Sequence, residues 1–127
     1  MAAMSAMKGR VPLVVSGDMH SIALGTMLGS GRLDFKANPI NVALPGTIGT
    51  WPGGWPSNGI RGTPARPSAV LDFAEQIKPI EQHGFILADF MADKIVLRFF
   101  TWDVKTQPVE AIDTLPPFHT AELNRPS

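Results

Sequence analysis

The sequence predicts an α/β (α+β) fold that consists mostly of strands, with few helices and one long Gly/Pro-rich loop. Residues 11–15 are a run of branched apolar residues, the pattern of a strand buried on both faces. Residues 84–91 and 94–102 are two β-rich runs separated by Ala-Asp, which predicts a β-hairpin. Most of the twelve glycines and twelve prolines lie between residues 25 and 67, so the middle of the chain is predicted to be loop.

The length of 127 residues corresponds to one ordinary domain, and a hydrophobic content of 44% is that of a globular protein. A self-contained small domain seldom carries more than about 15 residues of structureless loop, and the predicted loop is longer than this. Two interpretations follow. Either the loop forms a binding surface, or residues 1–127 form a single partial domain that another part of a larger protein supports.

The composition excludes several classes of partner and site. Eleven basic and eleven acidic side chains cancel and no strongly basic run occurs, so we expect no specific binding to nucleic acid. No apolar run is long enough for a membrane span. The absence of cysteine excludes disulfides and thiolate zinc sites. Residues 1–9 place their charge after the apolar part, the reverse of a signal peptide, so no compartment is predicted.

The first third of the chain is predicted to contain the end of a helix and several strands. Residues 1–9 are rich in Ala and Met and end in basic residues and glycine, which predicts the last turns of a helix leading into the strand at 11–15. Residues 21–29 are predicted to form a second strand or a short helix, followed by a turn at 29–32. Residues 40–44 alternate apolar and polar side chains and end at Pro-Gly, which predicts a further strand.

The long loop, residues 47–67, carries Trp51 and Trp55, and two interpretations of these rings are open. The indole rings either pack as anchors of the loop, which is the more common arrangement, or form a platform for a ligand. Arg61 and Arg66 lie in the same loop, and we expect them to be ordinary solvated arginines.

The last part of the chain is predicted to be mainly strand. Residues 68–78 have a cap-like serine, apolar residues near helical spacing and a terminal lysine, which predicts a short helix stopped by Pro79. The hairpin is apolar on both faces, so we expect it to lie in a sandwich with layers above and below. Residues 103–107 are predicted to form a polar turn. After it, residues 109–115 are predicted to pair as a strand, and residues 118–123 to form a final strand with His119 facing outward.

A carboxylate and an imidazole, Asp18 and His20, directly follow the first predicted strand. Ligands of open α/β folds collect beyond the carboxyl ends of strands, and positions two apart in an extended chain face one side. An aspartate oxygen and an imidazole nitrogen suit Zn, Mn or Fe, and the oxygen also suits Ca or Mg. A second interpretation stays open, in which Ser16 or Asp18 caps a helix and His20 is merely hydrogen-bonded, because metal sites normally take about three protein donors. His83 is a candidate third ligand, although we expect its role to be mainly structural.

Several short segments with Gly, Pro, Trp or charged residues follow one another in a defined order. They are Ser16-Gly17-Asp18-Met19-His20-Ser21, Asn38-Pro39, Pro45-Gly46-Thr47-Ile48-Gly49-Thr50, Gly54-Trp55-Pro56-Ser57, Arg61-Gly62, the hairpin from His83 to Asp103, and Asp113-Thr114-Leu115-Pro116-Pro117-Phe118-His119. Together, from about Val11 onward, they resemble the carboxyl-terminal part of PhoD-like phosphatases. This alkaline phosphatase D family is a branch of the calcineurin-like binuclear metallophosphatases.

The resemblance implies a β-sandwich of two mixed sheets flanked by helices, of which this chain is the carboxyl-terminal portion, with two metal ions at the ends of the sheet strands. It implies that Asp18 and His20, in the family's Gly-Asp-x-His segment, are metal ligands. The implied cofactors are two ions of Fe, Ca, Mn or Zn, and the implied substrate is a phosphate mono- or diester. The implied reaction is in-line attack by a metal-bound hydroxide.

The family's Asp-x-His, Gly-Asp and Gly-Asn-His-type motifs, which bring most of the metal ligands, lie upstream in such enzymes and do not precede Asp18 here. The resemblance therefore implies a truncated or separately encoded end of a phosphatase that is weak or inactive alone. Its expected partners are the missing amino-terminal part, or further copies of the chain bound through exposed sheet edges. The alternative is a non-catalytic interaction or structural module that kept the sheet and lost the chemistry.

Overall fold

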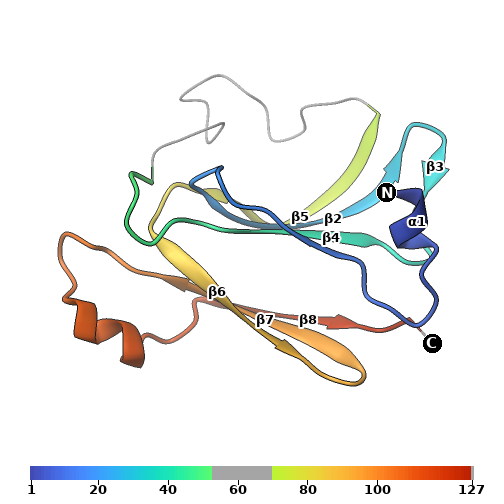
Figure 1. Ribbon diagram of the computed structural model, residues 1–127. Helices are drawn as coiled ribbons and strands as arrows, with labels where there is room; N and C mark the ends of the chain where they lie inside the picture. The colour runs from blue at the N-terminus through green and yellow to red at the C-terminus, as the bar shows by residue number, and fades with distance from the viewer. Residues whose placement is uncertain (53–69, 127) are drawn as a thin grey trace.

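Two β-sheets pack against each other in the computed structural model, which describes residues 1–52 and 70–126 (Figure 1). The described residues are mostly strand with few helical turns, which confirms the predicted fold class. The helical turns are α1, Ala2–Ser5, and the 3-10 helix η2, Val109–Thr114. Among the described residues, no helix is long and apolar enough to cross a membrane.

The first sheet is centred on its second strand along the chain, β2. Its strands are β1 Leu13–Val15, β2 Ile22–Ser30, β3 Leu33–Asp34, β4 Ile40–Pro45 and β5 Leu71–Ile80. β3 and β4 pair with successive parts of β2, β5 pairs with β2 over its whole length, and β1 pairs in parallel with β4. Residues 22–30 are therefore a strand, and of the two interpretations of residues 21–29 the helix is wrong.

The second sheet contains the predicted hairpin. Its strands are β6 Gly84–Phe90, β7 Lys94–Thr101 and β8 His119–Asn124, in the order β6-β7-β8. The hairpin closes with Phe90 opposite Ile95, and β8 pairs antiparallel with β7. The predictions of the hairpin and of the final strand are confirmed.

The core lies between the two sheets and is built from the alternate residues of strands on both sides. The residues that form it are Ile22, Leu24, Ala43 and Ile77 from the first sheet and Leu97, Phe99, Ala121 and Leu123 from the second. Leu97 and Phe99 in β7 are fully buried. The inner face of the hairpin therefore lies in a sandwich, as predicted. On its outer face Leu87 is 45% exposed, so the expectation of a layer on both faces is wrong there.

In the segment predicted as a short helix, residues 68–78, residues 71–78 instead belong to the strand β5, and residues 68 and 69 lie outside the described residues. Its apolar residues Leu71, Phe73 and Ile77 also lie at even spacings, so the pattern fits one face of a strand as well as a helix. Pairing with β2 over residues that include Met27 and Gly25 decides between the two. The expected stop at Pro79 is wrong for the same reason, because an edge strand tolerates proline.

The first predicted strand is shorter and less buried than expected. β1 covers only residues 13–15, lies at the edge of its sheet next to β4, and leaves Val15 58% exposed. Pro12 is buried and its carbonyl oxygen accepts hydrogen bonds from the backbone N–H and the side-chain Nδ2 of Asn41. The prediction of burial on both faces is wrong, because Val15 is exposed and Leu13 and Val14 are only half-buried.

Two predictions near the carboxyl terminus are also wrong. Residues 109–115 form the 3-10 helix η2 rather than a strand, between Pro108 and Pro116. His119 shares the inward face of β8 with Ala121, and its ring lies 5.9 Å from the ring of Phe99. Side chains in β8 point alternately to the core and to the outside, and those of residues 121 and 123 are buried in the core. Residue 119 is two positions before residue 121, so its side chain lies on the core side as well.

Candidate functional site

The predicted metal ligands lie in a turn between β1 and β2. The backbone N–H of Ser16 donates to the carbonyl oxygen of Ala43 at 3.1 Å, and the chain then leaves the sheet and returns at Ile22. Asp18 is exposed and His20 is half-buried. The two residues therefore follow the carboxyl end of a strand, as the sequence predicts.

The backbone of this turn is not extended. Asp18 has φ 68° and His20 has φ 50°, both in the left-handed region. The expectation that the two side chains face one side because the chain stays extended is therefore wrong. Within the described residues, these are the two non-glycine positions with positive φ. A left-handed conformation costs an L-residue about 1–2 kcal/mol, and such strain tends to occur at functional sites.

Replacing Asp18 with glycine is expected to raise the free energy of unfolding by about 1 kcal/mol, since glycine has no Cβ to strain the left-handed backbone. Urea denaturation followed by circular dichroism measures this change. Asp113→Gly is the matched control, because Asp113 is an exposed carboxylate whose φ is not positive, in the helix η2. That variant is expected to lose about 0.5–1 kcal/mol. Equal destabilisation of both variants would contradict the strain at Asp18.

Several chain turns meet at the same end of the sandwich as Asp18 and His20. β1 and β4 are parallel, so the segment after β4 begins beside the turn, and Ile22 pairs with Ile80 at the end of β5. Thr47 forms a β-bridge with His83, and its carbonyl oxygen accepts the N–H of Gly84 at 2.9 Å. The topology therefore gathers the segments after β1, β4 and β5 at this end.

The donors of this turn have the chemistry of metal ligands, but they are too few for a metal centre. His83, the candidate third ligand, is half-buried at the junction of the sheets, and its carbonyl oxygen accepts the N–H of Trp102 at 3.0 Å. Among residues 1–52 and 70–126, no three or more His, Cys, Asp or Glu side chains form a group that could hold a metal ion. Asp18 and His20 alone fall short of the usual number of about three or more protein donors.

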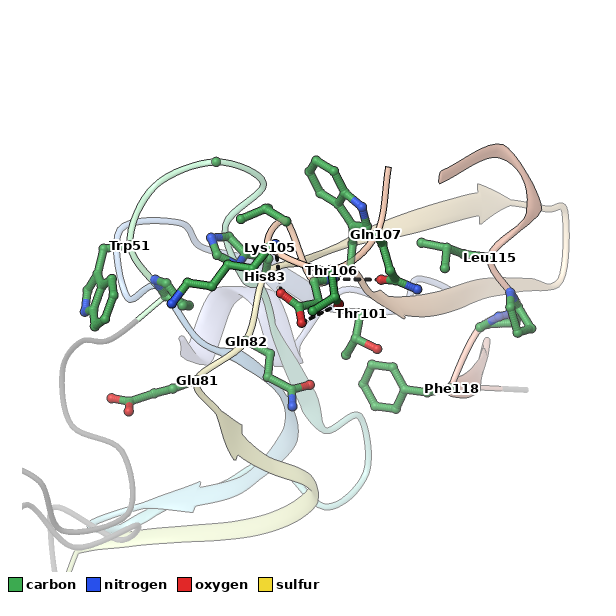
Figure 2. Close-up of a pocket in the computed structure, with 17 residues that line it drawn as sticks. Trp51, Glu81, Gln82, His83, Thr101, Lys105, Thr106, Gln107, Leu115 and Phe118 are labelled. Carbon is green, nitrogen blue, oxygen red and sulfur yellow. Dashed lines mark hydrogen bonds between the residues drawn. The ribbon is translucent and has the colours of Figure 1, made fainter. Parts of the chain in front are cut away.

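A pocket of about 960 Å³ lies at this end of the sandwich (Figure 2). Its walls come from the segment after β4, the turn between β5 and β6, and the segments that follow β7 and precede β8. Trp51 and Lys105 lie on one side of the pocket and Leu115 and Phe118 on the other, as Figure 2 shows. Neither Asp18 nor His20 lines it.

Aromatic, proline and polar side chains are mixed in the pocket. Trp51 is 70% exposed, and the Lys105 ammonium lies 5.9 Å from the centroid of its ring. The buried indole N–H of Trp102 has no hydrogen-bond partner within the described residues. Such a pocket suits an organic ligand with an apolar body and a hydrogen-bond acceptor. The exposure of Trp51 contradicts its interpretation as a packed anchor of the loop. Trp55, Arg61 and Arg66 lie outside the described residues.

Asp103 organises the predicted polar turn, which lines part of this pocket. The Thr106 hydroxyl donates to Asp103 Oδ2 at 2.6 Å, and the backbone N–H of Lys105 donates to Asp103 Oδ1 at 3.0 Å. These hydrogen bonds, with weaker help from the charges of Lys105 and His83, lower the pKa of the Asp103 carboxyl below 3.8. The sequence predicts the turn, but it does not reveal that the Asp103 carboxylate accepts the hydrogen bonds that hold the turn.

Removing the hydroxyl with Thr106→Val is expected to raise the pKa of Asp103 toward 3.8. Because folding lowers the pKa of this carboxyl, its contribution to stability is present above the unfolded value and is lost as the pH falls through the folded value. The stability difference between the parent and the variant should therefore be present at neutral pH and shrink as the pH falls below the ordinary value of 3.8. NMR titration of the Asp103 carboxyl carbon measures the pKa directly. An unchanged pKa in Thr106→Val would contradict the assignment.

Comparisons of the chain with protein-family models, with curated proteins and with solved structures give no match.

Proposed function

We propose that this chain is the carboxyl-terminal part of a metal-dependent phosphoesterase of the PhoD-like kind, to which Asp18 and His20 contribute metal ligands. The observation that carries the proposal is the left-handed backbone of both residues. Glycine adopts such a backbone without strain, and aspartate and histidine adopt it less readily than glycine, although more often than most other residues. The presence of an aspartate and a histidine there, at a cost in stability, favours a role for their side chains.

The sheet architecture supports a site that is completed by other protein. β1 pairs in parallel with β4, and its outer edge has no partner strand among the described residues. Parallel strands are usually buried inside a sheet with both faces covered, whereas Val15 in β1 is 58% exposed. An additional strand or layer beside β1 would cover this edge and bring further ligands to the turn that holds Asp18 and His20.

The proposed chemistry is hydrolysis of phosphate mono- or diesters. A bound metal pair of this kind polarises a phosphoryl oxygen and supplies an activated water. The residues of this chain would hold the ions, and their place in an exposed turn leaves the site open to a phosphoester. The pocket beside Trp51 lies at the same end of the sandwich and can accept the apolar part of an ester.

A non-catalytic module is the second candidate. It is favoured by one observation, that no group of three metal-ligating side chains is found among residues 1–52 and 70–126. In this alternative the sandwich serves interaction or structure, and the strain at Asp18 is a remnant.

The deciding experiment compares metal content and activity in two samples, the chain alone and the chain co-expressed with the polypeptide encoded immediately upstream of Met1. We expect the chain alone to show weak or no turnover of p-nitrophenyl phosphate or its bis ester, and the combined sample to show metal-dependent turnover. Asp18→Asn and His20→Ala should each reduce metal affinity or activity about 10–100-fold or more.

Asp72→Asn is the matched control, since Asp72 is an exposed carboxylate on β5. Unchanged metal content in both Asp18→Asn and His20→Ala would favour the non-catalytic module. Robust metal-dependent turnover by the chain alone would contradict the proposal that other protein completes the site.

A further inference from the structure

The outer strand β6 presents an open backbone edge. Within the described residues its one sheet neighbour is β7, and beyond the hydrogen bond from Gly84 N–H to Thr47 no strand pairs with its other side. On the β7 side, the carbonyl oxygen of His83 accepts the N–H of Trp102, and the N–H of Met91 donates to the carbonyl oxygen of Lys94. Because the direction of backbone groups alternates along a strand, the odd-numbered residues face β7. The groups at the open edge therefore belong to Ile86, Ala88 and Phe90.

This edge lacks the features by which sheet edges are usually protected. β6 has the sequence Gly-Phe-Ile-Leu-Ala-Asp-Phe, with no proline and no lysine. Its one charge, Asp89, accepts a hydrogen bond from Arg98 Nη2 at 2.8 Å and is thereby paired. By contrast, the edge strand β5 carries Lys78 and Pro79, and β1 is only three residues long. Short edges, unpaired charges and prolines prevent strand addition, whereas β6 is seven residues long, has no proline, and carries one carboxylate that is paired.

Large apolar side chains surround the open edge. Phe90 is 73% exposed, Met91 46% and Leu87 45%. Every second side chain of a strand points to the same face, so Phe90 shares a face of β6 with Ile86 and Ala88. Nearer Gly84, this face covers the core. An apolar strand with an unpaired backbone and exposed aromatic surface is a template for a further strand.

We propose that β6 pairs antiparallel with β6 of a second copy of this chain, about a two-fold axis at Ala88. In this register Ala88 lies opposite its own counterpart and Ile86 lies opposite Phe90 of the other copy, so the outward backbone groups of all three residues pair. Exposed Phe90 then packs on Ile86 of the other copy. No like charges meet, because Asp89 lies opposite Leu87. The result is a continuous six-stranded sheet across the dimer, and the proposal does not depend on the phosphatase assignment.

Sedimentation velocity of the full chain over about 10–500 µM tests the association. This range of concentrations is needed because an interface made by one pair of edge strands is small, and the association is therefore weak and concentration-dependent. The mean mass is expected to rise from 13.7 kDa toward twice that value. Ala88→Pro removes an outward N–H without removing a bond to β7, and should weaken association at least about tenfold. Phe90→Lys places a charge at the edge and should have the same effect.

Leu33→Lys and Val15→Lys, on the edge strands β3 and β1, are matched controls that should leave the association unchanged. A monomer throughout the concentration range would overturn the proposal. So would association that Val15→Lys abolishes while Ala88→Pro and Phe90→Lys leave it intact, because the interface would then be β1.

Cross-linking tests the register and needs no loss of stability. The chain has no cysteine, and directly opposed residues in such a pair have Cα atoms about 5.5 Å apart, within disulfide range. Ala88→Cys is therefore expected to form a disulfide-linked dimer under mild oxidation. Ala92→Cys is the control in the exposed hairpin turn, far from its counterpart in this register, and should cross-link at least about tenfold more slowly. Equal rates for the two variants would overturn the proposed axis.

Discussion

Replacing Phe99 with alanine is expected to lower the free energy of unfolding by about 3–5 kcal/mol. The Phe99 side chain is fully buried between the two sheets, and its ring contacts those of Phe118 and His119 at centroid distances of 6.4 and 5.9 Å. Alanine leaves a cavity that β7 cannot close, because the strand is paired on both sides by β6 and β8. A domain of this size has a total stability of about 5–15 kcal/mol, so a large share would be lost.

Equilibrium urea denaturation monitored by tryptophan fluorescence measures this loss. Phe90→Ala is the matched control, since Phe90 lies in the same hairpin and is 73% exposed. At concentrations that keep the chain monomeric, it is expected to change stability by less than about 0.5 kcal/mol. A loss below about 1 kcal/mol for Phe99→Ala would mean that the two sheets do not share the core described here.

Replacing Gly84 with alanine is expected to cost about 3 kcal/mol, the upper part of the range for overpacked sites. A Cβ at this position would overlap the carbonyl oxygen of Phe100 in the neighbouring strand and the side chain of Ile22 in the other sheet. The Phe100 carbonyl is backbone within the β6–β7 ladder, so it cannot move aside without breaking sheet pairing. Gly84 therefore sets the closest approach of the two sheets at the end that carries the candidate site.

Gly49→Ala is the matched control, because a Cβ at Gly49 would meet no atom within 4 Å. Its effect is expected to stay within about 0.5 kcal/mol. Thermal unfolding followed by circular dichroism compares the two variants, and Gly84→Ala should lower Tm by at least about 10 °C. Similar Tm values for the two variants would contradict the close approach at Gly84.

The strands that the sequence predicts correctly are those whose pattern is local. The hairpin has two long β-rich runs and a two-residue connection, and residues 40–44 alternate and end in Pro-Gly. Such signals are independent of distant parts of the chain. The class of the fold follows from these segments because strands with apolar residues on both faces need a second layer.

The errors arise where a distant strand decides the outcome. Residues 68–78 fit a helix and a strand equally well, and their pairing with β2 selects the strand. The branched apolar residues of the first strand predict a central, buried strand, but the order of strands in the sheet places β1 at the edge, and that order cannot be seen in the local sequence. The inward position of His119 follows from the register of β8 on β7, which a single histidine does not reveal.

The candidate site was predicted in part. The sequence places Asp18 and His20 after a strand, and the structure confirms that placement. It does not reveal the left-handed backbone, because aspartate and histidine also occur widely in ordinary conformations. Nor does it reveal the pocket beside Trp51, whose walls come from four segments that only the fold brings together. The assignment as a metal-ligating turn stays a prediction.

The pairing of β2 with β5 bears on how the chain folds during synthesis. β2 ends at Ser30 and the strand that covers its whole length begins at Leu71, so a ribosome must add about 40 more residues before that pairing can begin. At about 5–20 residues per second this takes roughly 2–8 seconds, during which β2 has only β3 and β4 as partners. The second sheet, whose strands are near neighbours in the chain, forms from local contacts and can then cover a first sheet that is already complete.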